Sequence, residues 1–475
     1  MPQSEIASPM RLKLPQEDTI AAIATPPGEG GIGIVRLSGP RAPEVLGKIW
    51  QGRLPLRDFE SHRLYFGSFT DPQSGETLDE GMAVWMKAPR SYTGEEVLEI
   101  QAHGGPLILN RLLEILVQEG LRVAQPGEFT RRAFLNGKMD LLQAEAVGEL
   151  IHAQSEAALK NAHQQLEGRL SQEVNQLRRQ VVELVARIEA AIDFPDEDIE
   201  IIAPEQTRKE ISALEAVLNE WQGKFRLGRL VREGVRLALV GRPNVGKSSL
   251  LNHLVGEEKA IVHSTPGTTR DVVEGWMEIE GVSFHLMDTA GIREGSGPVE
   301  REGIQRSLKA SQMADLTLWV LDVSQKLTEE DYGIMQSLEG RALLVGNKAD
   351  LTVEVSGLPE KWAPPPEIRK AEWHLVSAQT GEGIPSLKVA LAKEMGLSLL
   401  QEREQAYLNN ARHREGLAGA AEALERARLA LENRMPSECV AADLRQATAY
   451  LGCLLGEISN EDVLDKIFSE FCLGK

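Results

Sequence analysis

The chain has 475 residues, of which 42% are hydrophobic and 26% are charged, so it can form several folded domains and is not a disordered protein. Its 52 basic and 71 acidic side chains give a formal net charge of −19. This charge excludes a general nucleic-acid coat, and any contact with RNA must be local. Cys439, Cys453 and Cys472 have no C-x-x-C spacing, which excludes a disulfide scaffold and favours a reducing compartment. Neither a signal-peptide-like start nor a run of 18 apolar residues is present, so we expect a cytoplasmic protein without a membrane segment.

Four stretches of the chain differ in pattern. Residues 1–137 are rich in Gly and Pro and contain short strand-like runs. Residues 138–234 have the three-and-four spacing of amphipathic helices, and residues 396–475 are again helical in pattern, rich in Ala and Leu. Residues 235–395 alternate apolar strand runs with helical patterns, which predicts an α/β unit with a mostly parallel sheet. The pattern is consistent with one helical domain into which the α/β unit is inserted, and equally with two separate helical domains.

A phosphate-binding loop is predicted at the start of the α/β unit. The strand-like VRLALV leads into GRPNVGKSS and then into a helical run. Gly241, Gly246, Lys247 and Ser248 complete the pattern G-x-x-x-x-G-K-[ST]. The glycines allow backbone N–H groups to surround phosphates at a helix N-terminus. We expect Lys247 to act in catalysis by reaching the β/γ-phosphates, and Ser248 to ligate Mg²⁺.

Four further motifs indicate that the nucleotide is GTP. Asp350 of the NKAD motif can accept two N–H donors from guanine, which adenine does not offer. The SAQ motif after the strand WHLV is placed to close over the base, and the DTAG and HSTPGTTRD segments supply ligands near the γ-phosphate and Mg²⁺. The predicted GTP-binding residues are Asn244, Val245, Gly246, Lys247, Ser248, Ser249, His263, Ser264, Thr265, Pro266, Gly267, Thr268, Thr269, Asp288, Thr289, Ala290, Gly291, Asn347, Lys348, Asp350, Ser377, Ala378 and Gln379.

The residue that orients the attacking water is not evident from the motifs. Ile292 occupies the position at which Ras-type proteins have a glutamine, and its side chain cannot bind water. Glu294, Glu300 and Glu302 lie downstream and are all candidates, and the sequence alone does not choose between them.

Together these motifs resemble the bacterial MnmE (TrmE) family of tRNA-modifying GTPases. GRPNVGKSSL, PGTTRD, DTAGIRE and NKAD are similar to that family, as are ATPPGEGGIGIVRLSG, SYTGEEVLEIQAHGG, PGEFTRRAFLNGKMDLLQAEA and the final FCLGK. The resemblance implies a multi-domain fold of the α/β and α classes. An α+β folate-binding and dimerisation domain would span 1–137, a helical domain in two parts 138–234 and 396–475, and an inserted Ras-like P-loop GTPase domain 235–395.

The resemblance also implies a reaction and its partners. The family forms a heterotetramer with the flavoprotein MnmG and attaches an aminomethyl-type group at C5 of tRNA uridine 34. It uses GTP, Mg²⁺ and a tetrahydrofolate such as 5-formyltetrahydrofolate. Potassium-dependent pairing of two GTP domains within a homodimer activates hydrolysis.

The residues implied by the resemblance can be given by position. Glu300 would orient water, and Ser248 and Thr269 would ligate Mg²⁺. The K⁺ ligands would be Asn244, His263, Thr265 and Thr268. The folate site would contain Arg36, Glu99, Lys138 and Lys475. Cys472 is a candidate nucleophile or a buried thiol, and this alternative stays open.

A second function class is a GTP-switched ribosome-assembly factor that binds rRNA without covalent chemistry. GRPNVGKSS and TTRD are also typical of such factors. The N-terminal signatures and the FCLGK end favour the tRNA-modifying enzyme, because an assembly factor has no need of a folate site. The basic side chains of the helical part are interpreted as a solvated face rather than as RNA contacts; they are Arg178, Arg179, Arg412, His413 and Arg414.

Overall fold

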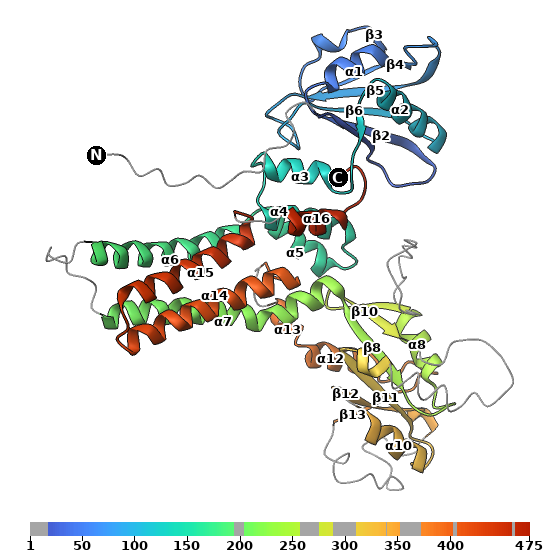
Figure 1. Ribbon diagram of the computed structural model, residues 1–475. Coiled ribbons are helices and arrows are strands. Elements are labelled where there is room, and N and C mark those ends of the chain that lie inside the picture. Colours follow the sequence, from blue (N-terminus) through green and yellow to red (C-terminus); the bar gives the residue numbers. More distant parts are fainter. Residues whose placement is uncertain are drawn as a thin grey trace. The chain divides into compact units, whose positions relative to one another are not determined.

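The computed structural model describes residues 18–193, 204–256, 275–287, 310–338, 340–351, 372–401, 406–457 and 461–475 (Figure 1). The chain forms two compact units. One unit comprises the chain up to His152 together with Ala162–Glu220 and Arg412–Lys475, and the other comprises Ala153–Asn161 and Trp221–Ala411. The helices before and after the α/β segment therefore share a unit. The prediction of an inserted α/β unit is confirmed, and the alternative of two separate helical domains is wrong.

A seven-stranded sheet organises the N-terminal part of the first unit. Its order is β3-β4-β5-β6-β2-β1-β7, and every pairing is antiparallel except that of β1 with β7. The strands are β1 (Ile20–Ile23), β2 (Gly30–Ser38), β3 (Trp50–Gly52), β4 (Leu64–Thr70), β5 (Thr77–Met86), β6 (Val97–Gly104) and β7 (Arg122–Val123). The accompanying helices are α1 (Ala42–Ile49), η1 (Leu56–Asp58), α2 (Pro106–Gln118) and α3 (Glu128–Leu135).

The two faces of this sheet differ in their cover. Because side chains alternate along a strand, Val35 and Leu37 of β2 lie on the face that packs against α1 and α2, and both are fully buried. Arg36 between them belongs to the other face. Phe66 of β4 and Met82 of β5 are paired residues, and their side chains are 63% and 38% exposed. This second face therefore presents apolar side chains beside a charged one.

Helices form the rest of the first unit. Five of them are α4 (Leu141–His152), α6 (Arg169–Asp193), α14 (Ala411–Glu432), α15 (Ser437–Leu455) and α16 (Glu461–Ser469). Two more, α5 (Glu156–Leu166) and α7 (Pro204–Glu233), contribute one end to each unit. Although α6 and α15 are far apart in sequence, they lie alongside each other (Figure 1). The apolar stripe of α6, from Leu170 to Leu184, is buried as its spacing predicts.

A buried ion cluster joins three of these helices. Glu145 of α4 accepts hydrogen bonds from Arg412 Nε at 2.9 Å and lies 2.8 Å from His413 Nε2. Arg412 also donates to the Cys453 carbonyl of α15 at 2.8 Å. Burial raises the pKa of Glu145, but the charges of His413 and Arg412 outweigh it and lower the pKa to about 2. The interpretation of Arg412 and His413 as solvated is therefore wrong, because a buried carboxylate requires them as partners.

The segment after α16 is packed rather than frayed. Phe468 and Phe471 are 2% and 9% exposed and contact each other and the apolar face of α4, which includes Leu141 and Val147. The two phenylalanines therefore dock the end of the chain on the helical part of this unit.

The second unit contains a six-stranded sheet of order β13-β12-β11-β8-β10-β9. All neighbouring strands are parallel except β9 and β10, which form an antiparallel hairpin. The prediction of a mostly parallel sheet is confirmed. The strands are β8 (Val235–Val240), β9 (Gly275–Ile279), β10 (Val282–Met287), β11 (Leu316–Asp322), β12 (Ala342–Asn347) and β13 (Trp373–Leu375). The helices of this unit are α8 (Lys247–Gly256), α10 (Glu329–Ser337), η2 (Ala349–Leu351), α12 (Ile384–Met395) and α13 (Ser398–Gln401).

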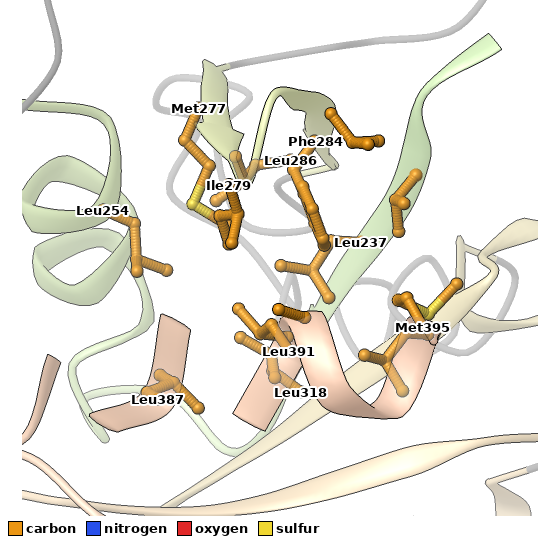
Figure 2. Packing of buried hydrophobic residues seen from close by; sticks show 14 of the residues in the cluster. Leu237, Leu254, Met277, Ile279, Phe284, Leu286, Leu318, Leu387, Leu391 and Met395 are labelled. Atoms are coloured by element: carbon orange, nitrogen blue, oxygen red, sulfur yellow. The ribbon is translucent and has the colours of Figure 1, made fainter. Parts of the chain in front are cut away.

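The main core of this unit lies between the sheet and its helices. Leu254 of α8 and Leu391 of α12 point into the same cluster as Leu237 of β8 and Met277 of β9 (Figure 2). This packing holds the carboxyl ends of the parallel strands in one row, and loops that follow these ends carry functional groups in sheets of this type. Among the helices that the structure describes, none combines the length and apolar character needed to cross a membrane.

Candidate functional site

The phosphate loop lies between β8 and α8, as predicted. Asn244 has a φ of +64° and Gly246 a φ of +96°, so the chain turns sharply before the helix begins at Lys247. A Cβ atom at Gly246 would lie 2.2 Å from Asn347 Nδ2, so only glycine fits there. The turn directs backbone N–H groups and the start of α8 toward one point, which suits an anionic phosphate.

Lys247 is held on the loop itself. Its Nζ donates to the carbonyl oxygens of Gly241 and Arg242, each at 2.8 Å. These carbonyls use two of the three N–H donors of the Lys247 ammonium group. Ser248 and Ser249 are exposed in the first turn of α8, where a hydroxyl can approach a cation next to the phosphates.

The loop after β12 is joined to the phosphate loop. Asn347 Nδ2 donates to the Val245 carbonyl at 2.8 Å, and Asn347 Oδ1 accepts the Ala378 N–H at 2.9 Å. Lys348 Nζ donates to the Asn244 carbonyl at 2.9 Å. The structure therefore brings the phosphate loop, the NKAD motif and the SAQ motif together at the carboxyl ends of the parallel strands. Asn347 and Lys348 are the predicted nucleotide-binding residues that connect these loops.

Asp350 is exposed within η2, two residues beyond Lys348. The Ala349 N–H donates to the Val376 carbonyl at 3.1 Å, which ties η2 to the loop after β13. In that loop Ser377 is fully buried and Gln379 is exposed. The carboxylate of Asp350 is thus available to a ligand on a loop whose backbone is fixed.

One residue of this edge was missed by motif reasoning. Asp322, the last residue of β11, accepts a hydrogen bond from Lys348 Nζ at 2.7 Å and from the Ser324 hydroxyl at 2.5 Å. Burial raises the pKa of Asp322, but these hydrogen bonds outweigh it and the pKa lies below its usual value. The signal was present in the sequence, because Asp322 ends a strand that is otherwise apolar except for Thr317.

The switch residues lie outside the described residues. These are His263, Ser264, Thr265, Pro266, Gly267, Thr268, Thr269, Asp288, Thr289, Ala290 and Gly291, together with the candidate water-orienting residues Glu294, Glu300 and Glu302. Their assignment to Mg²⁺, K⁺ and catalysis stays a prediction.

A second cluster is built on the N-terminal sheet. Arg36 of β2 and Glu99 of β6 are paired across the two strands. Arg36 Nε and Nη2 each lie 2.8 Å from Glu99 Oε1. The Arg36 guanidinium also lies 5.8 Å from the ring centres of Tyr92 and Phe129. The pair is mostly shielded from solvent, with side-chain exposures of 17% and 13%.

The FCLGK segment reaches the same cluster. Arg36 Nη1 donates to the Gly474 carbonyl at 3.1 Å, and the Phe129 N–H donates to the Lys475 main-chain oxygen at 3.2 Å. Gly474 has a φ of +88°, and a Cβ there would lie 2.6 Å from the Ile23 carbonyl oxygen. Burial, and then the charge of Arg36, lower the pKa of the Lys475 amine. Three predicted residues, Arg36, Glu99 and Lys475, are therefore neighbours.

The other two predicted residues of this region have different surroundings. Lys138 Nζ donates to the Pro89 carbonyl at 3.0 Å, and its side chain lies beside Gly94. The structure shows no contact of Lys138 with Arg36 or Glu99 among the described residues. Cys472 is exposed, with its Sγ 4.0 Å from His152 Nε2, so the alternative of a buried thiol is wrong. Within the described segments no group of three His, Cys, Asp or Glu side chains could hold a metal ion.

The phosphate loop, the Asn-Lys-x-Asp loop and the parallel sheet define a P-loop protein of the GTP-binding class. A family model described as the MnmE helical domain matches residues 141–472, and one described as the GTP-binding protein TrmE N-terminus matches residues 19–138. The chain therefore belongs to the MnmE family of tRNA modification GTPases.

Sequence relatives agree with this family. The tRNA modification GTPase MnmE of Geobacter sulfurreducens is 44% identical over 461 residues, covering 97% of this chain and 99% of that protein. The same protein of Aquifex aeolicus is 45% identical, covering 96% of this chain and 100% of that protein. Among solved structures, the G domain of the T. maritima FeoB iron transporter is 28% identical over 34% of this chain and 97% of that chain. Its TM-score is 0.24, so no conclusion about this chain is based on that structure.

Proposed function

We propose that the chain is the GTP-hydrolysing component of a complex that modifies C5 of uridine 34 in tRNA, forming carboxymethylaminomethyl- or aminomethyl-type uridine. It would use a one-carbon unit from a tetrahydrofolate. One observation supports the use of folate. Arg36, Glu99 and Lys475 lie close together, although they come from β2, β6 and the FCLGK segment. The proposed limits are 1–137 for the folate and dimerisation domain, 235–395 for the GTP domain, and 138–234 with 396–475 for the helical domain.

The charges at the N-terminal cluster fit a folate. A reduced pterin offers N–H donors along one edge, and a carboxylate such as Glu99 can accept two of them. Arg36 contacts only Oε1 of Glu99, and no donor among the described residues contacts Oε2. Arg36 and Lys475 place positive charge beside Glu99. The glutamyl carboxylates at the other end of the folate also require cations, and Lys138 is a candidate for them. When bound, the folate supplies the one-carbon unit, while these residues bind and orient it.

In the GTP domain each residue has a proposed task. Lys247 would reach the β/γ-phosphates, and Ser248 with Thr269 would hold Mg²⁺. Asp350 would select guanine. A K⁺ ion held by Asn244, His263, Thr265 and Thr268 would place positive charge at the phosphates, where other GTPases use an arginine.

The proposed homodimer and the flavoprotein partner MnmG require exposed contact surfaces. The open face of the N-terminal sheet presents Phe66, Leu64 and Met82, which are 63%, 49% and 38% exposed. Apolar side chains gathered on one face favour a protein partner. This face also carries the Arg36–Glu99 pair, so a second protomer seated there would cover the proposed folate site.

The proposed reaction is tested on tRNA. Transfer RNA from cells that lack this protein should be digested to nucleosides and compared with tRNA from cells that carry it. We expect the C5 modification of uridine 34 to disappear and to return when the gene is restored. Normal wobble uridines together with defective ribosomal subunits would instead support the ribosome-assembly function.

Folate binding is expected to depend on Glu99. The wild-type protein should bind 5-formyltetrahydrofolate in calorimetry, and Glu99→Ala should weaken binding by roughly 1.5–3 kcal/mol, the size of a charged hydrogen bond. Asp79→Ala is a matched control, because Asp79 lies in the same sheet and pairs with His103. This control should leave binding unchanged, and GTP hydrolysis should barely change in either variant. A wild-type protein that binds no folate would exclude the site.

Hydrolysis is expected to depend on potassium and on protein concentration. Turnover should be higher in KCl than in NaCl at equal ionic strength, because the smaller ion fits the proposed ligands less well. Turnover per protomer should rise with protein concentration, because pairing of GTP domains is bimolecular. Equal rates of hydrolysis in the two salts would contradict the assignment of Asn244, Thr265 and Thr268 as K⁺ ligands.

A further inference from the structure

The N-terminus of α10 carries a fully buried carboxylate, that of Asp331. Asp331 is the third residue of the helix, and Thr328 is the N-cap. Asp331 Oδ2 accepts the Thr328 N–H at 2.9 Å and the Thr328 hydroxyl at 3.0 Å. This capping box stabilises the start of the helix and occupies one carboxylate oxygen only.

The other oxygen of Asp331 contacts the phosphate loop. Arg242 Nε, from the second residue of GRPNVGKS, donates to Asp331 Oδ1 at 2.6 Å. The Arg242 side chain is 16% exposed, so the ion pair is largely shielded from water and salt. Breaking a buried pair by removing one partner leaves an uncompensated charge, which is strongly unfavourable. Arg242 is therefore held against α10.

The backbone of Arg242 is part of the nucleotide site. Its carbonyl oxygen accepts Lys247 Nζ at 2.8 Å. Farther along the loop, Lys348 holds the Asn244 carbonyl and Asn347 holds the Val245 carbonyl. The loop is thus fastened at its start by the ion pair and in its middle by the loop after β12. A loop fixed in advance loses less conformational freedom when a phosphate binds.

We propose that Arg242 and Asp331 are positioning residues for nucleotide binding, which hold the start of the phosphate loop in its binding conformation. This inference rests on the GTP site described above. The pair acts on the part of the loop that would surround phosphates common to GDP and GTP, so its loss weakens both nucleotides equally. It touches neither the base nor the attacking water.

The test measures the affinity of the full chain for GDP and GTP at fixed Mg²⁺ and salt. Asp331→Asn keeps the side-chain shape but removes the charge, and we expect it to lower both affinities about tenfold, equivalent to about 1.4 kcal/mol. Arg242→Gln should have a similar effect. The double variant should bind no more weakly than the weaker single variant, because the two residues act as one unit.

Asp315→Asn is the matched control. Asp315 precedes β11, at the amino end of the parallel strands, and pairs with Arg229 Nη2 at 2.5 Å. The phosphate loop follows the carboxyl end of β8, at the other end of these strands. The control should lower the melting temperature as Asp331→Asn does, but leave both affinities within twofold of wild type. If Asp331→Asn loses stability and keeps its affinities, the pair is structural only and the inference is wrong. If the wild type binds neither nucleotide, the GTP site itself fails.

Discussion

Replacing Glu300 by alanine is expected to lower the rate of GTP hydrolysis by about 10²–10⁴-fold, the usual contribution of a positioned acid–base group. Ile292 leaves the attacking water without a side-chain partner, and a carboxylate is one of the few groups that can orient it. The affinity for GTP should stay nearly intact, because Glu300 would contact water rather than the nucleotide. Single-turnover hydrolysis and nucleotide titration measure the two quantities separately.

Glu294→Ala and Glu302→Ala are the controls for this experiment. Both remove a carboxylate from the same segment and should leave the rate within a few-fold of wild type. Modification of tRNA should fall together with hydrolysis in the Glu300 variant if hydrolysis drives the cycle. Near-normal turnover of Glu300→Ala would show that Glu300 is a solvated charge, and a slow neighbouring variant would then identify the residue.

Replacing Asp350 by asparagine is expected to change the preferred base. Guanine would donate two hydrogen bonds to the Asp350 carboxylate, each worth about 1.5–3 kcal/mol. An amide keeps one acceptor and places a donor opposite a guanine N–H, so at least one of these bonds is lost and GTP affinity should fall by roughly 10–10²-fold or more. Xanthine has a carbonyl where guanine has its amine, so XTP should bind the variant better than GTP. Competition of labelled GDP by GTP, XTP and ATP measures the preference.

Asp322→Asn is the matched control for Asp350. It is the same substitution at the same edge of the sheet, but it acts through Lys348 and the phosphate loop. We expect it to weaken all nucleotides without changing the order of preference. An unchanged preference for GTP over ATP in Asp350→Asn would contradict the assignment of Asp350.

Much of the GTP unit could be predicted because its signals are local. The pattern from Gly241 to Ser248 places the glycines, the lysine and the serine on consecutive residues, and a strand before it and a helix after it are sufficient to shape the loop. The strands β8, β10, β11 and β12 correspond to the apolar runs of the sequence, because buried parallel strands are apolar on both faces. NKAD follows such a strand and therefore reaches the same edge.

Contacts between distant segments could not be predicted from spacing. Arg242 and Asp331 are 89 residues apart, and Arg36 contacts the carbonyl of Gly474 across 438 residues. Residue type and local pattern do not specify such partners, because a charged side chain in a sequence is most often solvated. Arg412 and His413 illustrate the error, since both serve the buried Glu145.

The sequence by itself determined the class of nucleotide, the phosphate loop and the alternation of helical and α/β segments. These depend on residues within a few positions of one another, whose geometry the backbone dictates. The tertiary structure decided that the two helical stretches form one unit, that the FCLGK segment packs beside Arg36 and Glu99, and which charges are buried in pairs. The physical reason is that burial makes a charge dependent on its partner, and only the folded chain determines which partner is near.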